Sequence, residues 1–144
     1  MSADTDIAVI EDQPRVKLWG EHLDDYKIIK TYKGKFVLSD EGQLFAKFFP
    51  KKEWDKVSFF HDDLVRELGV KDAKSMDVKE VIIGGGKIEF EWVDDYAECR
   101  LYGKSTVYGD YDRGDIDTVA LGEEIRDVFE LGDVPILVIP DFEE

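Results

Sequence analysis

Hydrophobic and charged residues alternate in the middle of the chain. Ile88, Phe90 and Trp92 are separated by charged residues, which is the period-two pattern of a β-strand with one buried face. A turn with two aspartates follows at 93–95, and residues 96–102 again place small and apolar side chains on one face. The pattern therefore predicts a β-hairpin over residues 87–102.

Similar strand-like runs occur elsewhere in the chain, separated by glycine, proline or acidic turns. The last run contains Pro135, which indicates a strand near the edge of a sheet. The additional predicted strands cover residues 27–32, 35–38, 43–49, 78–83 and 134–139.

Two stretches have the spacing of amphipathic helices. Residues 54–69 predict the main helix, whose N-cap we assign to Ser58, and Gly69 follows its end. Residues 117–130 predict a second helix, which Gly132 closes. Its expected inward residues are Val119, Leu121, Ile125, Val128 and Phe129.

The order of these elements predicts one α+β domain, in which two main helices pack on a mixed β-sheet. We place this domain at residues 26–144 and treat residues 1–25 as an acidic N-terminal arm. Residues 1–13 fit either a frayed tail or an edge strand, and residues 14–26 fit either a short helix or an irregular arm.

Composition narrows the class of protein. Nine Phe, six Tyr and three Trp, with 43% hydrophobic residues, predict a folded chain although 37% of the residues are charged. The formal net charge of −15 repels nucleic acid and anionic membranes, so we expect neither as a partner. The sequence has no apolar run of membrane-spanning length and no signal-peptide pattern, so we expect a cytoplasmic protein, and we expect a monomer.

Glycine-rich segments lie at both ends of the predicted hairpin. Three glycines occupy positions 84–86, and residues 102–109 read YGKSTVYG. A phosphate-binding Walker loop is excluded, because position 98 is Glu98 where that motif needs glycine. A dinucleotide fingerprint is excluded as well, because the three glycines lead into a strand pattern and that fold requires a helix there.

These motifs and their order resemble the Janus/Ocnus family, which includes the phosphohistidine phosphatases. The resemblance covers about residues 35–138 and implies a phosphohistidine phosphatase-like fold. It also implies metal-independent hydrolysis of the P–N bond of phosphohistidine or related phosphoramidates, without a cofactor, on a phosphorylated protein or a small phosphoramidate. The matching residues are Gly84, Gly85, Gly86, Lys87, Ile88, Tyr102, Gly103, Ser105, Tyr108 and Gly109.

The resemblance also implies the roles of individual residues. His61, in the stretch FHDD, matches the catalytic histidine, and Lys35 matches a substrate-binding lysine on an early strand. Ser105, Thr106 and Val107 match the phosphate-binding loop, in which backbone amides at Ser105 and Val107 would hold the phosphate oxygens.

The chemistry of His61 is consistent with this role. A histidine in the first turn of a helix tends to be neutral, because the helix dipole disfavours the imidazolium ion, and a neutral ring can serve as a base or a nucleophile. The alternative interpretation is a half-buried helix residue that packs on Phe60 or caps a neighbour. Asp62 and Asp63 could orient the ring or suit the helix N-terminus, and we assign them no chemical role.

The sequence leaves two other functions open. A non-catalytic anion- or protein-binding domain of the same fold is one, and a metal-dependent hydrolase is the other. The aspartates at positions 110, 112, 115 and 117 lack the spacing of a calcium loop and fit a solvated loop. His22 fits a solvated surface residue, and we expect the single cysteine, Cys99, to be a small buried residue. We therefore predict no metal site.

Overall fold

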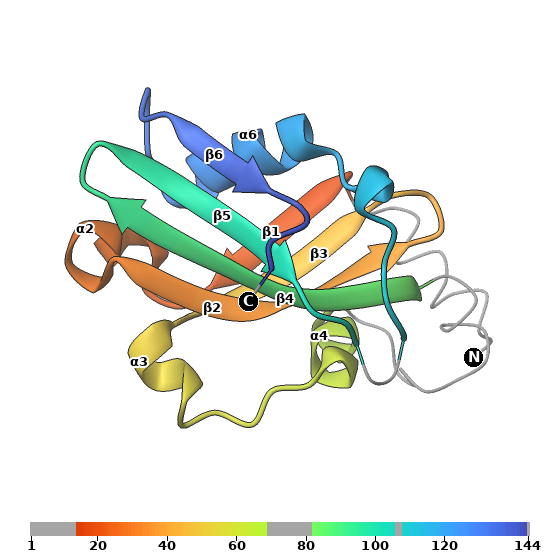
Figure 1. Cartoon of the computed structure of the whole chain (residues 1–144). Helices are drawn as coiled ribbons and strands as arrows, with labels where there is room; N and C mark the ends of the chain where they lie inside the picture. The colour runs from red at the N-terminus through yellow and green to blue at the C-terminus, as the bar shows by residue number, and fades with distance from the viewer. Residues whose placement is uncertain (1–13, 69–81, 106–107, 144) are drawn as a thin grey trace.

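A curved, mixed β-sheet forms the centre of the molecule. The computed structural model describes residues 14–68, 82–105 and 108–143. Within these residues six strands pair in the order β1-β3-β2-β4-β5-β6, as Figure 1 shows. The single α+β domain with a mixed sheet is thus confirmed. The strands are β1 (Val16–Gly20), β2 (Thr31–Ser39), β3 (Leu44–Pro50), β4 (Ile82–Val93), β5 (Tyr96–Tyr102) and β6 (Ile136–Ile139).

The four central strands, β3, β2, β4 and β5, run antiparallel to one another, whereas the outer strands β1 and β6 pair in parallel with β3 and β5. The predicted hairpin is confirmed as β4 and β5, and β6 lies at an edge of the described sheet, as Pro135 indicated. The helices are α2 (Tyr26–Ile29), α3 (Lys51–Trp54), α4 (His61–Glu67) and α6 (Thr118–Val128), with two 3₁₀ turns at Leu23–Asp25 and Arg113–Asp115.

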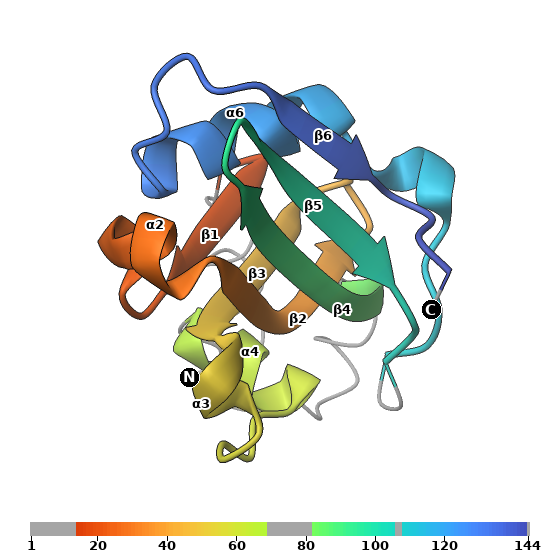
Figure 2. The ribbon, with the colours of Figure 1, turned by 60° about the vertical axis from the view of Figure 1, so that its left-hand side comes forward.

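The larger hydrophobic core lies between the sheet and α6. Phe129, at the end of α6, stacks on Phe90 of β4 with ring centroids 3.9 Å apart, and Tyr32 and Phe48 meet it edge-on. All four side chains are fully buried or nearly so, which is where large aromatic side chains stabilise a fold most. Figure 2 shows α6 lying behind β6 and near β1, where it closes this side of the curved sheet.

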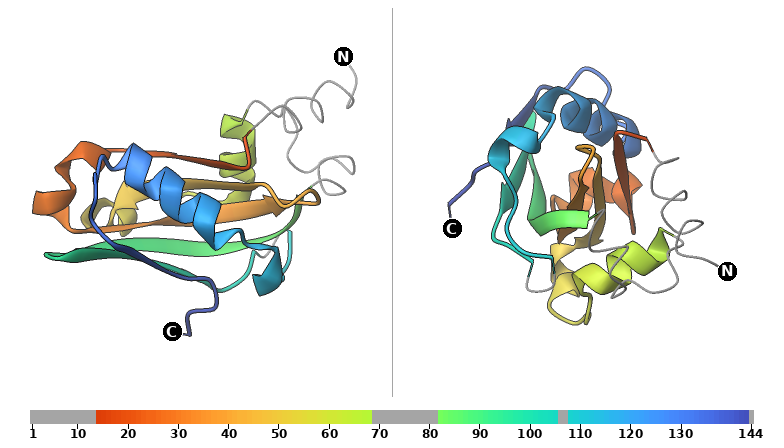
Figure 3. Two further views of the ribbon diagram at one scale, coloured as in Figure 1. Left: turned by 90° about the horizontal axis from the view of Figure 1, so that it is seen from above. Right: turned by 90° about the vertical axis from the view of Figure 1, so that its right-hand side faces the viewer.

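A smaller core lies on the opposite face, beneath α4. Val37 of β2 and Phe45 of β3 pack there against Leu64 and Val65 of α4 and against Tyr108. Successive residues of a strand face opposite sides of the sheet, so Phe36 serves the α6 side and Val37 the α4 side. Figure 3 shows α4 and α6 on opposite sides of the sheet. No helix among the described residues has the length and apolar character needed to cross a membrane.

The prediction of one helix over residues 54–69 is wrong. The chain forms the single turn α3, leaves helical geometry for residues 55–60, and begins α4 at His61. Phe59 packs edge-on against Phe49 of β3, and the Asp63 carboxylate accepts a hydrogen bond of 2.8 Å from the Phe60 amide. This side chain-to-backbone bond is one half of a capping box, and it starts the helix at Phe60 instead of Ser58.

The segment 14–26 also differs from the sequence prediction, because Val16–Gly20 is a strand and not a helix or an irregular arm. Gly20 lies so close to β3 that an added Cβ would be 2.3 Å from the Phe48 carbonyl oxygen. Residues 16–20, which we assigned to the N-terminal arm, are therefore hydrogen-bonded into the sheet. Residues 1–13 lie outside the described part.

Other boundaries shift for local reasons. Residues 26–29 form α2, and β2 then runs without a break through Gly34. A Cβ at Gly34 would lie 1.7 Å from the Lys47 carbonyl oxygen, so this glycine allows close strand contact and does not end the strand. Asp117 caps α6 by accepting a bond of 3.0 Å from the Ala120 amide. Val119, which we expected to face inward, is 70% exposed.

Candidate functional site

The three glycines of β4 remove side chains where other groups must lie against the strand. An added Cβ would be 2.3 Å from the Asp110 carbonyl oxygen at Gly84 and 2.4 Å from that of Phe36 at Gly85. At Gly86 it would be 2.6 Å from the Tyr102 carbonyl oxygen. All three distances are too short for any side chain, so the glycines allow close backbone approach from both sides.

His61 occupies the space above the second of these glycines. It is the first residue of α4 and is only 4% exposed. A Cβ on Gly85 would lie 3.1 Å from His61 Cδ2, so the ring rests directly on β4. His61 Nε2 is 2.9 Å from the Gly86 carbonyl oxygen. The predicted location of His61 at the start of a helix is confirmed.

This hydrogen bond determines the tautomer of the ring. A carbonyl oxygen can only accept a hydrogen bond, so Nε2 must carry the proton and donate it. In the neutral ring the basic lone pair is then on Nδ1. The backbone of β4 thus orients the His61 ring, and Nδ1 is the basic nitrogen of its neutral form.

Asp63 stabilises the start of α4, where His61 lies. Its carboxylate accepts from the Phe60 amide and also pairs with Arg66 at 3.0 Å. The exposed Phe60 ring lies under the ammonium group of Lys35, with Nζ 5.2 Å from the ring centroid. The residue that precedes His61 thus contacts the predicted substrate-binding lysine.

Two lysines extend the site along the sheet. Lys35 of β2 pairs with Lys87 of β4, and Lys87 follows Gly85 by two residues, so it projects from the same face of the sheet. The pKa of Lys35 is lowered, first by burial and then by the charge of Lys87, while Asp63 opposes this shift. Two like charges held side by side, one of them half-buried, are arranged to bind an anion.

Lys87 is a site residue to which the sequence analysis gave no chemical role. It was part of the glycine motif but fits an exposed strand position equally well. Strand register is what places Lys87 opposite Lys35, and register depends on pairing between segments that are distant in sequence.

The next residue on this face of β4 is acidic. Glu89 accepts hydrogen bonds from Tyr102 and Arg100, both at 2.9 Å. Burial raises the pKa of the Glu89 carboxyl, but these hydrogen bonds outweigh burial and the net pKa is lowered. A carboxylate therefore borders the pair of lysines.

The loop that follows β5 reaches the same part of β4. Ser105 and Gly109 exchange two backbone hydrogen bonds of 3.0 and 2.9 Å, and Gly109 accepts from the Gly85 amide at 3.3 Å. Tyr108 packs into the core under α4. The loop is thus fastened beside the glycine on which His61 rests.

Ser105 is buried and shapes this loop. Its hydroxyl oxygen accepts from the Tyr108 amide at 3.0 Å, and its own amide donates to Gly109. The Ser105 amide, predicted to hold a phosphate oxygen, is therefore engaged inside the loop. Thr106 and Val107 lie outside the described residues, so their predicted role remains a prediction.

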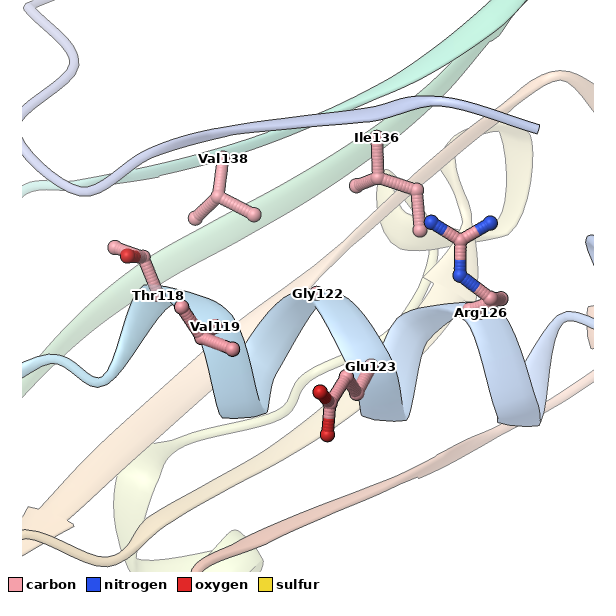
Figure 4. A pocket seen from close by; sticks show the side chains of 7 residues that line it. All are labelled: Thr118, Val119, Gly122, Glu123, Arg126, Ile136 and Val138. Atoms are coloured by element: carbon pink, nitrogen blue, oxygen red, sulfur yellow. The ribbon is translucent and has the colours of Figure 1, made fainter. Parts of the chain in front are cut away.

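A hollow with a volume of about 370 Å³ lies between α6 and β6, away from His61. In Figure 4 the Arg126 guanidinium lies beside Ile136, and the Glu123 carboxylate points away from β6. Arg126 donates to the carbonyl oxygens of Gly132 and Val134, both at 2.6 Å. It holds the connection between helix and strand, and this hollow presents no group comparable to His61.

Three of the aspartates after the loop form local side-chain hydrogen bonds or ion pairs. Asp110 pairs with Arg113 at 2.8 Å, and Asp112 accepts from the Gly114 amide at 2.9 Å. Asp117 caps α6 as described above. Cys99 is fully buried, as predicted, and burial raises the pKa of its thiol.

Comparison of the sequence with models of known protein families finds no match, and no curated protein matches it significantly. These comparisons therefore assign no function to the site.

Proposed function

We propose that this protein is a metal-independent phosphatase that hydrolyses the P–N bond of phosphohistidine or a related phosphoramidate. The observation that carries the proposal is the burial of His61 against β4, with Nε2 bonded to the Gly86 carbonyl oxygen. The resemblance of the glycine and loop motifs to the Janus/Ocnus family supports it. The substrate would be a phosphorylated protein or a small phosphoramidate.

His61 would act through Nδ1. As a base, Nδ1 removes a proton from water while the water oxygen bonds to phosphorus and the P–N bond breaks. As a nucleophile, Nδ1 bonds to phosphorus while the P–N bond of the substrate breaks, and water then cleaves the phosphorylated imidazole. In both routes the leaving nitrogen takes up a proton, and Nε2 keeps its bond to Gly86. A fixed ring lowers the cost of aligning the reacting atoms.

Lys35 and Lys87 would bind the phosphoryl oxygens. Phosphoryl transfer depends mainly on positioning and on stabilising charge on the non-reacting oxygens. Burial and the charge of Lys87 lower the pKa of Lys35, so a bound anion would stabilise its charged form. Binding a phosphoryl group between the two lysines removes their mutual repulsion.

The direct test is phosphate release from a phosphohistidine peptide and from a small phosphoramidate, with EDTA present throughout. We expect turnover by the wild type, and a loss of about 100- to 10,000-fold in His61→Ala and His61→Gln, the range that a positioned proton-transfer group contributes. Thermal unfolding of each variant controls for loss of structure. Added imidazole should restore part of the activity of His61→Ala, which a purely structural role would not allow.

The two routes differ in one measurable species. A nucleophilic His61 accumulates as phosphohistidine, which quenched-flow mass spectrometry of the wild type detects and which His61→Gln cannot form. A general base leaves the enzyme unmodified at every time point.

Two outcomes would contradict the proposal. One is a folded wild type that releases no phosphate, and the other is a His61→Ala variant that matches it. Phosphate binding without turnover would favour the alternative, a non-catalytic anion- or protein-binding domain.

A further inference from the structure

Three potential metal ligands converge at the end of the sheet where α2 and α3 lie. Glu21 and His22 belong to the connection after β1, and Glu53 belongs to α3. One ligand atom from each lies within 4.8 Å of the others. The segments that contribute them are about thirty residues apart in sequence and meet only in the folded chain.

Hydrogen bonds to the central strands hold the backbone of this cluster. The Glu21 amide donates to the carbonyl oxygen of Phe48 in β3 at 3.3 Å. The His22 carbonyl oxygen accepts from the Asp25 amide at 3.1 Å and from the hydroxyl of Tyr32, a fully buried residue. The backbone that presents Glu21 and His22 is therefore fixed from within the protein.

His22 has a backbone conformation that side-chain-bearing residues seldom adopt. Its φ is 59° and its ψ is 34°, in the left-handed region. Such a conformation persists where surrounding contacts enforce it and occurs preferentially at functional sites. Here it directs the imidazole of an exposed residue toward two carboxylates.

Two further acidic residues follow His22 in the chain. Asp24 and Asp25 belong to the 3₁₀ turn at Leu23–Asp25. Lys51 and Lys52 line an adjacent cavity of about 360 Å³, which His22 and Glu53 also line.

We propose that Glu21, His22 and Glu53 bind a divalent transition-metal ion, with Zn²⁺ as the best fit. One imidazole and two carboxylates form a donor set that zinc accepts, and its usual coordination number of four leaves one position for water or a small anion. His22 and Glu53 both line the cavity, and its lysines suit an anionic fourth ligand.

This site is separate from the one around His61. Tyr32, which holds His22, and Phe36, which borders Gly85, are four residues apart on β2, about 13 Å along the strand. Zinc at the cluster would join the connection after β1 to α3. The ion has no part in the proposed phosphatase reaction, which runs in EDTA.

The test is titration of the metal-free full chain with ZnCl₂ by calorimetry, alongside visible spectra of the Co²⁺-loaded protein. We expect one saturable zinc per chain and the intense absorption of tetrahedral Co²⁺. His22→Ala and Glu53→Gln should each weaken zinc binding by more than the roughly 10- to 100-fold that follows loss of a group that merely supports a ligand. Glu123→Gln is the matched control, since it removes one carboxylate charge from an exposed position on α6.

Zinc should also raise the melting temperature of the wild type and of Glu123→Gln, because the ion binds the folded chain in preference to the unfolded one. It should not raise that of His22→Ala. The proposal is overturned if the wild type binds no zinc, or if Glu53→Gln and Glu123→Gln weaken binding equally, because scattered surface carboxylates would then hold the ion.

Discussion

His61 reaches its place on the sheet because the strand beneath it carries no side chain. Its Nε2 proton is committed to a backbone oxygen, which leaves the basic character of the ring on Nδ1. The Asp63 carboxylate caps α4 by accepting from the Phe60 amide. None of the hydrogen bonds described above joins Asp63 to the His61 ring. One carboxylate therefore positions the histidine indirectly, by fixing the residue at which the helix begins.

The charge of Lys35 destabilises the folded protein, and a substitution at this position should show the effect. Because its pKa is lowered, the folded state holds this proton less tightly than the unfolded chain does, so the cost is fully present at neutral pH. We expect Lys35→Met to raise the free energy of unfolding at pH 7 by less than about 1 kcal/mol and to reduce phosphate release. The gain in stability should shrink as the pH rises toward about 10.4, the ordinary pKa of lysine.

Lys47 provides the matched control for this experiment. It lies on β3 directly opposite Lys35 and pairs with Glu67 at 3.0 Å. Lys47→Met should therefore lower the free energy of unfolding in urea denaturation, the opposite sign. A Lys35→Met variant that is less stable than the wild type at pH 7 would show that Lys35 contributes favourable contacts instead of strain.

At the scale of elements, the main feature of β4 is its row of three glycines, which have no side chains. Each glycine of the row 84–86 is contacted by a different partner, namely the chain at Asp110, the β2 backbone with His61, and β5. At these glycines β4 is therefore in close contact with α4, with the chain that follows the loop after β5, and with both neighbouring strands.

Gly85→Ala should disrupt the contacts of β4 with β2 and with His61. The new Cβ would lie 2.4 Å from the Phe36 carbonyl oxygen and 3.1 Å from His61 Cδ2, so backbone and ring must both shift. We expect a loss of stability of about 1–3 kcal/mol, as for other overpacked sites. Phosphate release should fall by about 100-fold, because displacement of a catalytic group by about 1 Å can have that effect.

Gly122→Ala is the control substitution for this prediction. Gly122 lies inside α6, where an added Cβ would meet only Val138 Cγ2 at 3.8 Å, an ordinary contact. The variant should gain roughly 0.5–1 kcal/mol in urea denaturation, because alanine favours helices over glycine, with activity unchanged. Full activity in Gly85→Ala would show that the position of the His61 ring is unimportant.

At the scale of the whole molecule, a small cationic area lies in a strongly acidic protein. The chain carries a formal net charge of −15, while Lys35 and Lys87 project side by side from one face of the sheet. In the proposed reaction, the overall field would repel phosphorylated substrates at a distance, and the two lysines would attract the phosphoryl group on contact. A phosphoryl group on a basic partner satisfies both conditions.

Peptide charge should therefore govern the rate of the proposed reaction. At low ionic strength, kcat/KM should be at least about tenfold higher for phosphohistidine within a basic peptide than within an acidic peptide of equal length. The ratio should fall toward one as NaCl is added, since the screening length shrinks to about 3 Å at 1 M salt. Equal rates at low salt would show that the long-range field has no effect on this site.

How much of this could be predicted from sequence depends on the range of the interactions involved. The β4–β5 hairpin, α6 and the burial of Cys99 follow from local periodicity and are confirmed. The strand β1 and the break between α3 and α4 were predicted wrongly, because close contact with β3 and the packing of Phe59 decide them. Tertiary contacts override the local structural preference of short segments more easily than that of long periodic ones.

The sequence by itself determined the α+β class, the hairpin and the presence of His61, Lys35 and the glycine motifs, because these depend on residue type and on neighbours a few positions away. Tertiary structure alone decided that His61 rests on Gly85, that Lys87 lies opposite Lys35, and that His22 meets Glu53. Strand register and the docking of helices bring these residues together, and both arise from burial of apolar surface between distant segments, which no local pattern specifies.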